Sequence, residues 1–147
     1  MRRALAAVIL SLIAAGAAAA APVKAGALTL DGLQIRSSPA GVPTTAAYLT
    51  IENRGKSADK LLSVDCACAA ATMMHRSENK AGVASMAMLT SLDIPAGAKV
   101  AFTPTGLHVM LVGVHGPLKA GGIQMMTLTF QKAGAVKAAF AVNDVIR

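Results

Sequence analysis

Short runs of alternating apolar and polar residues, each closed by turn residues, constrain this chain more than any other feature. Such alternation places every second side chain on one face, which is typical of strands that bury one face in a core. After the first twenty or so residues, no long run has the 3.6-residue period of an amphipathic helix, and there is no internal repeat. The sequence therefore predicts an all-β fold, a sandwich or Greek-key barrel. The expected strands are 47–52, 60–64, 71–75, 86–92, 99–102, 107–112, 125–130 and 136–142.

Two connecting segments carry their own turn signals. Residues 28–30 and 33–35 flank an Asp31-Gly32 pair, which predicts a small hairpin at the start of the domain. Residues 36–45 contain Pro39, Gly41 and Pro43, and we expect a loop there.

The first 21 residues have the composition of a secretory signal peptide. Arg2 and Arg3 precede an apolar run, 4–15, and small residues follow up to Ala21. The apolar run is shorter than the roughly 20 residues that a membrane-spanning helix needs. No Cys lies at the cleavage zone, so lipid anchoring is not indicated at that point. We expect export, cleavage near Ala20 or Ala21, and a single mature domain of residues 22–147 without a membrane span.

The charge pattern argues against nucleic acid as a partner. The chain has 14 Lys and Arg and 7 Asp and Glu; without Arg2 and Arg3 the basic residues number 12, for a net charge of +5. These charges are scattered, as on an ordinary surface. Tyr48 is the only Tyr and Trp is absent, so the chain lacks a stacking platform for single-stranded nucleic acid.

Two histidines and two methionines form a possible soft-metal binding set. His75 is followed after ten residues by Met86, then after twenty-one by His108, with Met110 two positions further on. His108 and Met110 would project from the same face of a strand. Thioether sulfur favours Cu(I), whereas imidazole also suits zinc, iron and nickel. The set therefore predicts one Cu(I) per chain, with Cu(II) binding left open; taken singly, each Met could instead be core filler and each His a structural residue.

This spacing, with the segments around it, resembles the periplasmic copper chaperone family of the PCu(A)C type, which has a His-x10-Met-x21-His-x-Met signature. The similarity covers nearly the whole chain after the leader. Supporting segments are AAYLTIENRG at 46–55, IPAG at 94–97, GLHVML at 106–111 and GPLKAGG at 116–122, within a run of similarity from Gly82 to Phe130.

The resemblance implies a cupredoxin-like β-barrel and a monomeric periplasmic carrier. It implies delivery of Cu(I) to respiratory oxidase, at the copper A site of cytochrome c oxidase, and the partner is the copper A subunit, a thioredoxin-like Sco-type assembly protein, or both. Copper buffering or resistance would use the same cage, so that alternative stays open. A β-sandwich binding module without metal, in which the His and Met are core residues, is the second alternative.

Other chemistry is less well supported. The sequence shows no Ser/His/Asp set, no paired carboxylates at useful spacing and no phosphate-binding Gly loop, so we do not expect an enzyme. A blue-copper site would need two His and a Cys with an axial Met, and the segment from His108 to Met110 has no Cys.

Several residues outside the set remain open. Cys66 and Cys68 could be free thiols, a disulfide or further Cu(I) ligands; an oxidising compartment favours the disulfide over free thiols. His115 is expected to be an exposed loop residue, with accessory binding as the alternative. Packing is favoured over copper binding for five methionines, although Met88 could share a face with Met86: Met73, Met74, Met88, Met125 and Met126.

Overall fold

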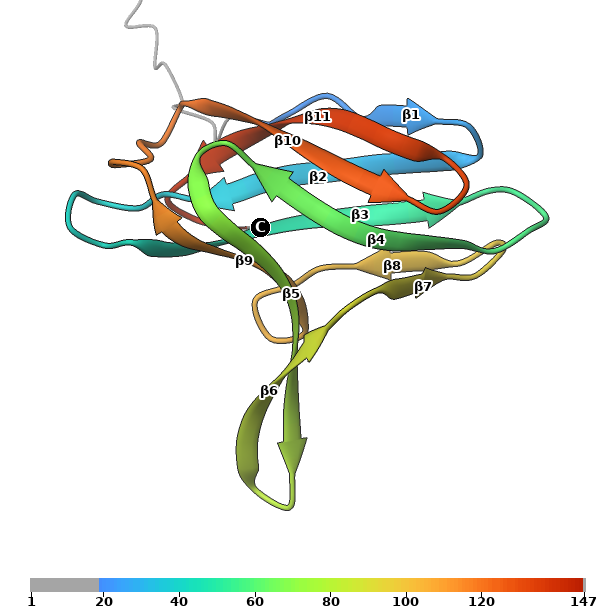
Figure 1. The fold of residues 1–147 in the computed structure, drawn as a ribbon, viewed down its shortest axis with the longest axis horizontal. Helices are drawn as coiled ribbons and strands as arrows, with labels where there is room; N and C mark the ends of the chain where they lie inside the picture. The colour runs from blue at the N-terminus through green and yellow to red at the C-terminus, as the bar shows by residue number, and fades with distance from the viewer. Residues whose placement is uncertain (1–18, 147) are drawn as a thin grey trace, which may run out of the picture.

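The computed structural model describes residues 19–146, and this range contains strands, turns and loops but no helix (Figure 1). The described range therefore has no helix that is long and apolar enough to cross a membrane. Most of the predicted signal peptide, residues 1–18, lies outside the described residues. The strands are β1 (Val23–Ala25), β2 (Leu28–Arg36), β3 (Thr44–Asn53), β4 (Asp59–Cys66), β5 (Ala69–Lys80), β6 (Val83–Leu89), β7 (Leu92–Ile94), β8 (Lys99–Ala101), β9 (Leu107–Val114), β10 (Ile123–Phe130) and β11 (Gly134–Asn143).

Hydrogen bonds join the strands into one mixed sheet with the order β6-β5-β9-β3-β2-β11-β10-β4-β7, with β1 added to β2 and β8 added to β3. The β11–β2 pair is parallel and the other strand pairs are antiparallel. The sheet curls so that β4 lies beside β5, where the Thr72 hydroxyl donates a hydrogen bond to the Val64 carbonyl. The all-β prediction is confirmed.

The inward faces of the curled sheet form one apolar core. Alternation sends these side chains inward, and full burial of each is worth about 1.5–3 kcal/mol. On β9, Val109 and Leu111 are completely buried in this core, so His108 and Met110 project from the opposite side of the strand. The other most completely buried side chains include Leu30, Ile35, Ile51, Leu61, Ile94, Leu128, Phe130 and Phe140.

A buried carboxylate ties the start of β4 to the β10–β11 turn. Asp59 is 8% exposed and accepts hydrogen bonds from the backbone N–H groups of Lys60 at 2.7 Å, Lys132 at 2.8 Å and Ala133 at 3.0 Å. Burial opposes ionisation of this carboxyl, but the three N–H donors outweigh it and lower the pKa of Asp59. Asp59 therefore holds two chain segments together as a carboxylate.

Two local predictions are wrong. Residues 28–35 do not form a hairpin, because Asp31 and Gly32 lie within the single strand β2, at an irregularity in its pairing with β3. The Asp-Gly pair makes a bulge instead of a chain reversal, because the register with β3 shifts between Asp31 and Gln34, and Gly32 adopts a φ of 60° there. The expected strand 86–92 is divided at Thr90 and Ser91, where β6 ends and β7 begins a separate pairing with β4.

The two cysteines are joined to each other. Cys66 and Cys68 form a disulfide across the β4–β5 turn, with their Cα atoms 5.1 Å apart. This confirms the disulfide interpretation, and the free-thiol interpretation is wrong. Because both sulfurs are used in the bridge, neither is a thiolate ligand in this state.

Candidate metal centre

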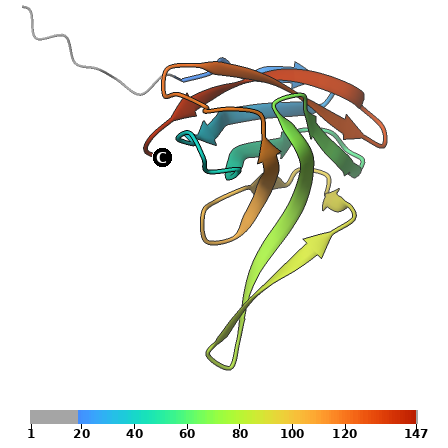
Figure 2. The ribbon, with the colours of Figure 1, turned by 60° about the vertical axis from the view of Figure 1, so that its left-hand side comes forward.

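The β5–β6 hairpin projects from the body of the domain, and both views show it as an extended arm (Figures 1 and 2). Its tip is the two-residue loop Ala81-Gly82, in which both residues have positive φ, 53° and 82°. Positive φ at both central positions is the geometry of the type I′ turn, which matches the twist of the strands it joins. β5 pairs with β6 on one side and with β9 on the other, so three strands share one face near the base of the arm.

Two imidazoles meet on this face. His75 on β5 lies directly opposite His108 on β9, and their ring centroids are 5.7 Å apart with the ring planes at 83°. His108 is 5% exposed, and its Nδ1 lies 3.1 Å from the Gly106 carbonyl oxygen. Because a carbonyl only accepts, Nδ1 must carry the proton, and the lone pair of His108 is on Nε2. Histidines that bind metals are held in this way by their second nitrogen.

The Nδ1 atom of His75 is buried and makes no hydrogen bond to any residue in the described range. A buried polar atom without a partner costs about 1–3 kcal/mol. A bound metal ion would remove this cost, either through Nδ1 itself or by reorienting the ring. His75 and His108 are thus placed so that both imidazoles could bind one metal ion.

Both predicted thioether ligands lie on the same face as the imidazoles. Residues directly opposite one another in an antiparallel pair project to the same side. Met86 on β6 lies opposite Ser77, two residues from His75, and its side chain is 62% exposed. Met110 lies two residues from His108 on β9 and is half-buried. All four predicted residues therefore share a face, with the imidazoles in contact and the two thioethers on either side along the strands.

Within β5, β6 and β9, all of them in the described range, the side chains on this face are neutral. The charged residues of the arm occupy the alternate positions of β5, so Arg76, Glu78 and Lys80 project from its other side. Lys80 and Glu78 form an ion pair there at 3.3 Å. An ion bound among uncharged imidazoles and thioethers would keep its own charge, which suits a monovalent soft ion.

The other methionines and His115 differ in how far the structure buries them. Met74 and Met126 are buried, as predicted. Met88 and Met125 are 64% and 55% exposed, so the packing interpretation is wrong for both. His115 is exposed just beyond β9, which confirms its position in a loop. Among residues 19–146, no group of three or more His, Cys, Asp or Glu side chains is placed to hold a metal ion.

Met73 and Met88 lie on the face that carries His75, His108, Met86 and Met110, which we call the ligand face, although packing is the prediction for both. Met88 lies opposite His75, and Met73 lies opposite Met110. The signal was in the sequence: each is two residues from a predicted ligand, the spacing that keeps a strand residue on the same side.

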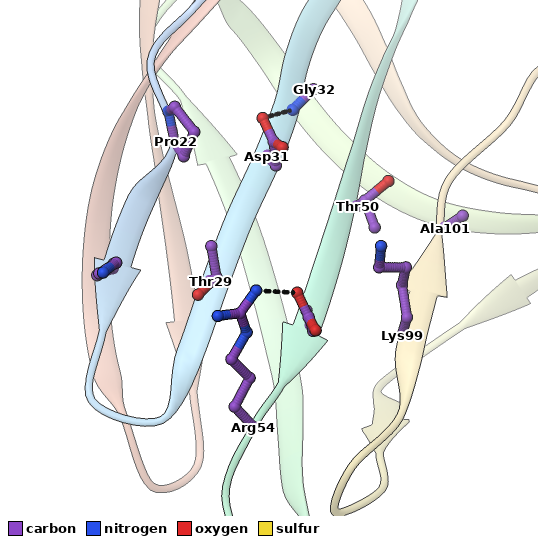
Figure 3. Close-up of a pocket in the computed structure, with 10 residues that line it drawn as sticks. Pro22, Thr29, Asp31, Gly32, Thr50, Arg54, Lys99 and Ala101 are labelled. Carbon is purple, nitrogen blue, oxygen red and sulfur yellow. Dashed lines mark hydrogen bonds and ion pairs between the residues drawn. The ribbon is translucent and has the colours of Figure 1, made fainter.

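A cleft on another part of the molecule has different chemistry. It has a volume of about 500 Å³ and is bordered by β1, β2, β3 and β8 (Figure 3). Its lining mixes Lys24, Asp31 and Lys99 with the Glu52–Arg54 ion pair at 3.0 Å. The hydrogen bond from Arg54 lowers the pKa of the Glu52 carboxyl. No His, Met or Cys of residues 19–146 lines this cleft, so these residues offer it no soft donor.

Comparison with known proteins supplies the family context. The family model described as "Putative lipoprotein LpqE-like" matches residues 28–142. A protein of Leifsonia xyli subsp. xyli (strain CTCB07), named "Putative lipoprotein Lxx21020", is 30% identical over 118 residues, which cover 78% of this chain and 71% of that protein.

Solved structures whose fold is similar to that of this chain include two with bound copper. The copper-bound PCuAC domain from PmoF2 has a TM-score of 0.73 at 24% identity, covering 85% of this chain and 99% of that domain. The solution structure of Cu(I)-bound DR1885 from Deinococcus radiodurans has a TM-score of 0.67 at 28% identity, covering 86% of this chain and 83% of that one. The predicted cupredoxin-like fold class is confirmed.

Proposed function

The chain belongs to the LpqE-like family, which is the PCu(A)C-type family of copper-binding chaperones, and from this membership we propose that it is a periplasmic Cu(I) carrier. The observation behind this proposal is the contact between His75 and His108, whose ring centroids lie 5.7 Å apart. In addition, the buried Nδ1 of His75 has no hydrogen-bond partner among the described residues. Met86 and Met110 would complete the ligand set from the same face.

The donor types suit transport in an oxidising compartment. Thioethers bind Cu(I) without forming disulfides, so such a site keeps its ligands where a dithiolate would be lost. The cysteines of this chain are instead bridged to each other, which supports a location outside the reducing cytoplasm. The leader-like residues 1–21 support export, and the matching family and relative are named as lipoproteins.

We propose that the recipient is the copper A site of cytochrome c oxidase, with a Sco-type protein as the other partner. A site of neutral ligands at the base of a projecting arm, with Met86 exposed on it, allows the recipient's ligands to replace those of the carrier one at a time. Buffering of periplasmic copper is the second candidate, because the same donors would store an ion as readily as pass it on.

The test is titration of the mature domain with Cu(I) against a competing chelator, followed by transfer to a purified copper A domain. We expect one tight equivalent of Cu(I), and the copper should elute with the copper A domain after mixing and separation. Tight binding without transfer to the copper A domain, alone or with a Sco-type protein, would favour buffering. Absence of stoichiometric Cu(I) uptake would exclude both copper functions.

A further inference from the structure

Met88 lies closer to the paired imidazoles along the sheet than Met86 does. The register aligns Met88 of β6, His75 of β5 and His108 of β9 in one row across three strands. Directly opposite residues have Cβ atoms about 4.5–5.5 Å apart, whereas diagonal neighbours are about 7–8 Å apart. Met86, opposite Ser77, is a diagonal neighbour of His75. Met88 can therefore reach an ion on His75 at least as easily as Met86 can.

Met73 has the matching position on the other side of the row. It lies opposite Met110 and two residues from His75 on β5, and it is half-buried. Each predicted thioether ligand is thus paired with a second thioether: Met86 with Met88 along β6, and Met110 with Met73 across β5 and β9. A flexible, unbranched thioether side chain can move between such neighbouring positions.

A hollow of about 220 Å³ joins the two additional methionines. Met73 and Met88 both line it, together with Leu62 and Asp65 of β4. Met88 is 64% exposed, so packing in the core does not account for it. Both methionines therefore border a common space that is open to solvent, and Asp65 borders it too.

We propose that Met73 and Met88 form a second thioether pair for the Cu(I) ion held by His75 and His108. This proposal rests on the Cu(I)-carrier function proposed above. The ion exchanges between Met86 and Met88, and between Met110 and Met73. In each exchange one Cu–S bond forms as another breaks, and neither the oxidation state nor the proton count changes. The second pair moves the ion toward the hollow, where a recipient's ligands reach it.

The test compares four Leu variants, which keep the size and apolar character of Met but remove the sulfur: Met86→Leu, Met88→Leu, Met86→Leu/Met88→Leu and Met125→Leu. We expect Met86→Leu to retain one Cu(I) with less than about a tenfold loss of affinity, since Met88 takes over the position. Met86→Leu/Met88→Leu should lose more than the product of the two single losses predicts. Met125→Leu, at an exposed methionine of β10 away from this face, is the matched control and should bind as the wild type does.

The second readout is the NMR signal of the methionine methyl groups on addition of Cu(I). The Met73 and Met88 methyl signals should shift along with those of Met86 and Met110, while the Met125 signal stays in place. If the wild type binds Cu(I) but the Met73 and Met88 signals do not move and the losses are independent, this proposal is overturned and the carrier function stands. If the wild type takes up no Cu(I), both proposals fail.

Discussion

Replacing both imidazoles, as His75→Ala/His108→Ala, is expected to remove tight Cu(I) binding from this protein. The two rings are in contact, and the third histidine of the chain, His115, lies in a loop beyond β9. Substituting a mere hydrogen-bonding partner of a ligand costs about 10–100-fold in metal affinity, so loss of the ligands themselves should cost more than about 100-fold. Competition titration with a Cu(I) chelator measures this loss.

A matched control is available in His115→Ala. His115 is exposed beyond the end of β9 and lies outside the ligand face, so its removal should leave the affinity unchanged. Because His108 is buried, its replacement could weaken the fold, and His108→Gln keeps most of the side-chain volume. A double variant that folds and still binds one Cu(I) with wild-type affinity would show that the imidazoles are structural.

The largest effect on stability is expected from Asp59→Ala. This change leaves three backbone N–H groups without their acceptor, those of Lys60, Lys132 and Ala133. A buried donor without a partner costs about 1–3 kcal/mol, so the free energy of unfolding should fall by about 3 kcal/mol. Urea unfolding monitored by circular dichroism gives this value, and a loss below about 1 kcal/mol would mean that water replaces the carboxylate.

The same carboxylate should make stability depend on pH. The folded pKa of Asp59 is lowered below its unfolded value of about 3.9, so the unfolded state binds the proton more readily. Its contribution is therefore fully present above about pH 4 and is lost as the pH falls through the folded pKa. Asp59→Asn keeps an acceptor but does not titrate there, and its unfolding free energy should fall less steeply below pH 4. Equal slopes in the two proteins would assign the acid sensitivity to other groups.

Alternation in the sequence predicted most strands, because side-chain direction in a strand depends only on whether a position is odd or even. It could not distinguish a turn from a bulge at Asp31-Gly32, since a positive φ at Gly32 serves either purpose. It also could not show that the predicted strand 86–92 breaks at Thr90 and Ser91, because that break depends on β7 pairing with β4 instead of β5.

The ligand face could be predicted only in part. The spacing of His108 and Met110 placed both on one side of a strand. The register of β5 with β6 and β9 decides which residues lie opposite one another. It places His75 opposite both His108 and Met88. Register is set by the whole sheet, so no local pattern reveals it. For this reason the sequence alone favours packing for Met88, whereas the structure places it exposed and opposite His75.

The most direct test of the proposed site is X-ray absorption at the copper edge of the mature protein loaded with one equivalent of Cu(I). The ligand face described here predicts a first shell of both imidazole nitrogen and thioether sulfur, and the imidazole scattering should disappear in His75→Ala/His108→Ala. A shell containing sulfur alone, or one without any sulfur, would contradict a site built from His75, His108 and the methionines beside them.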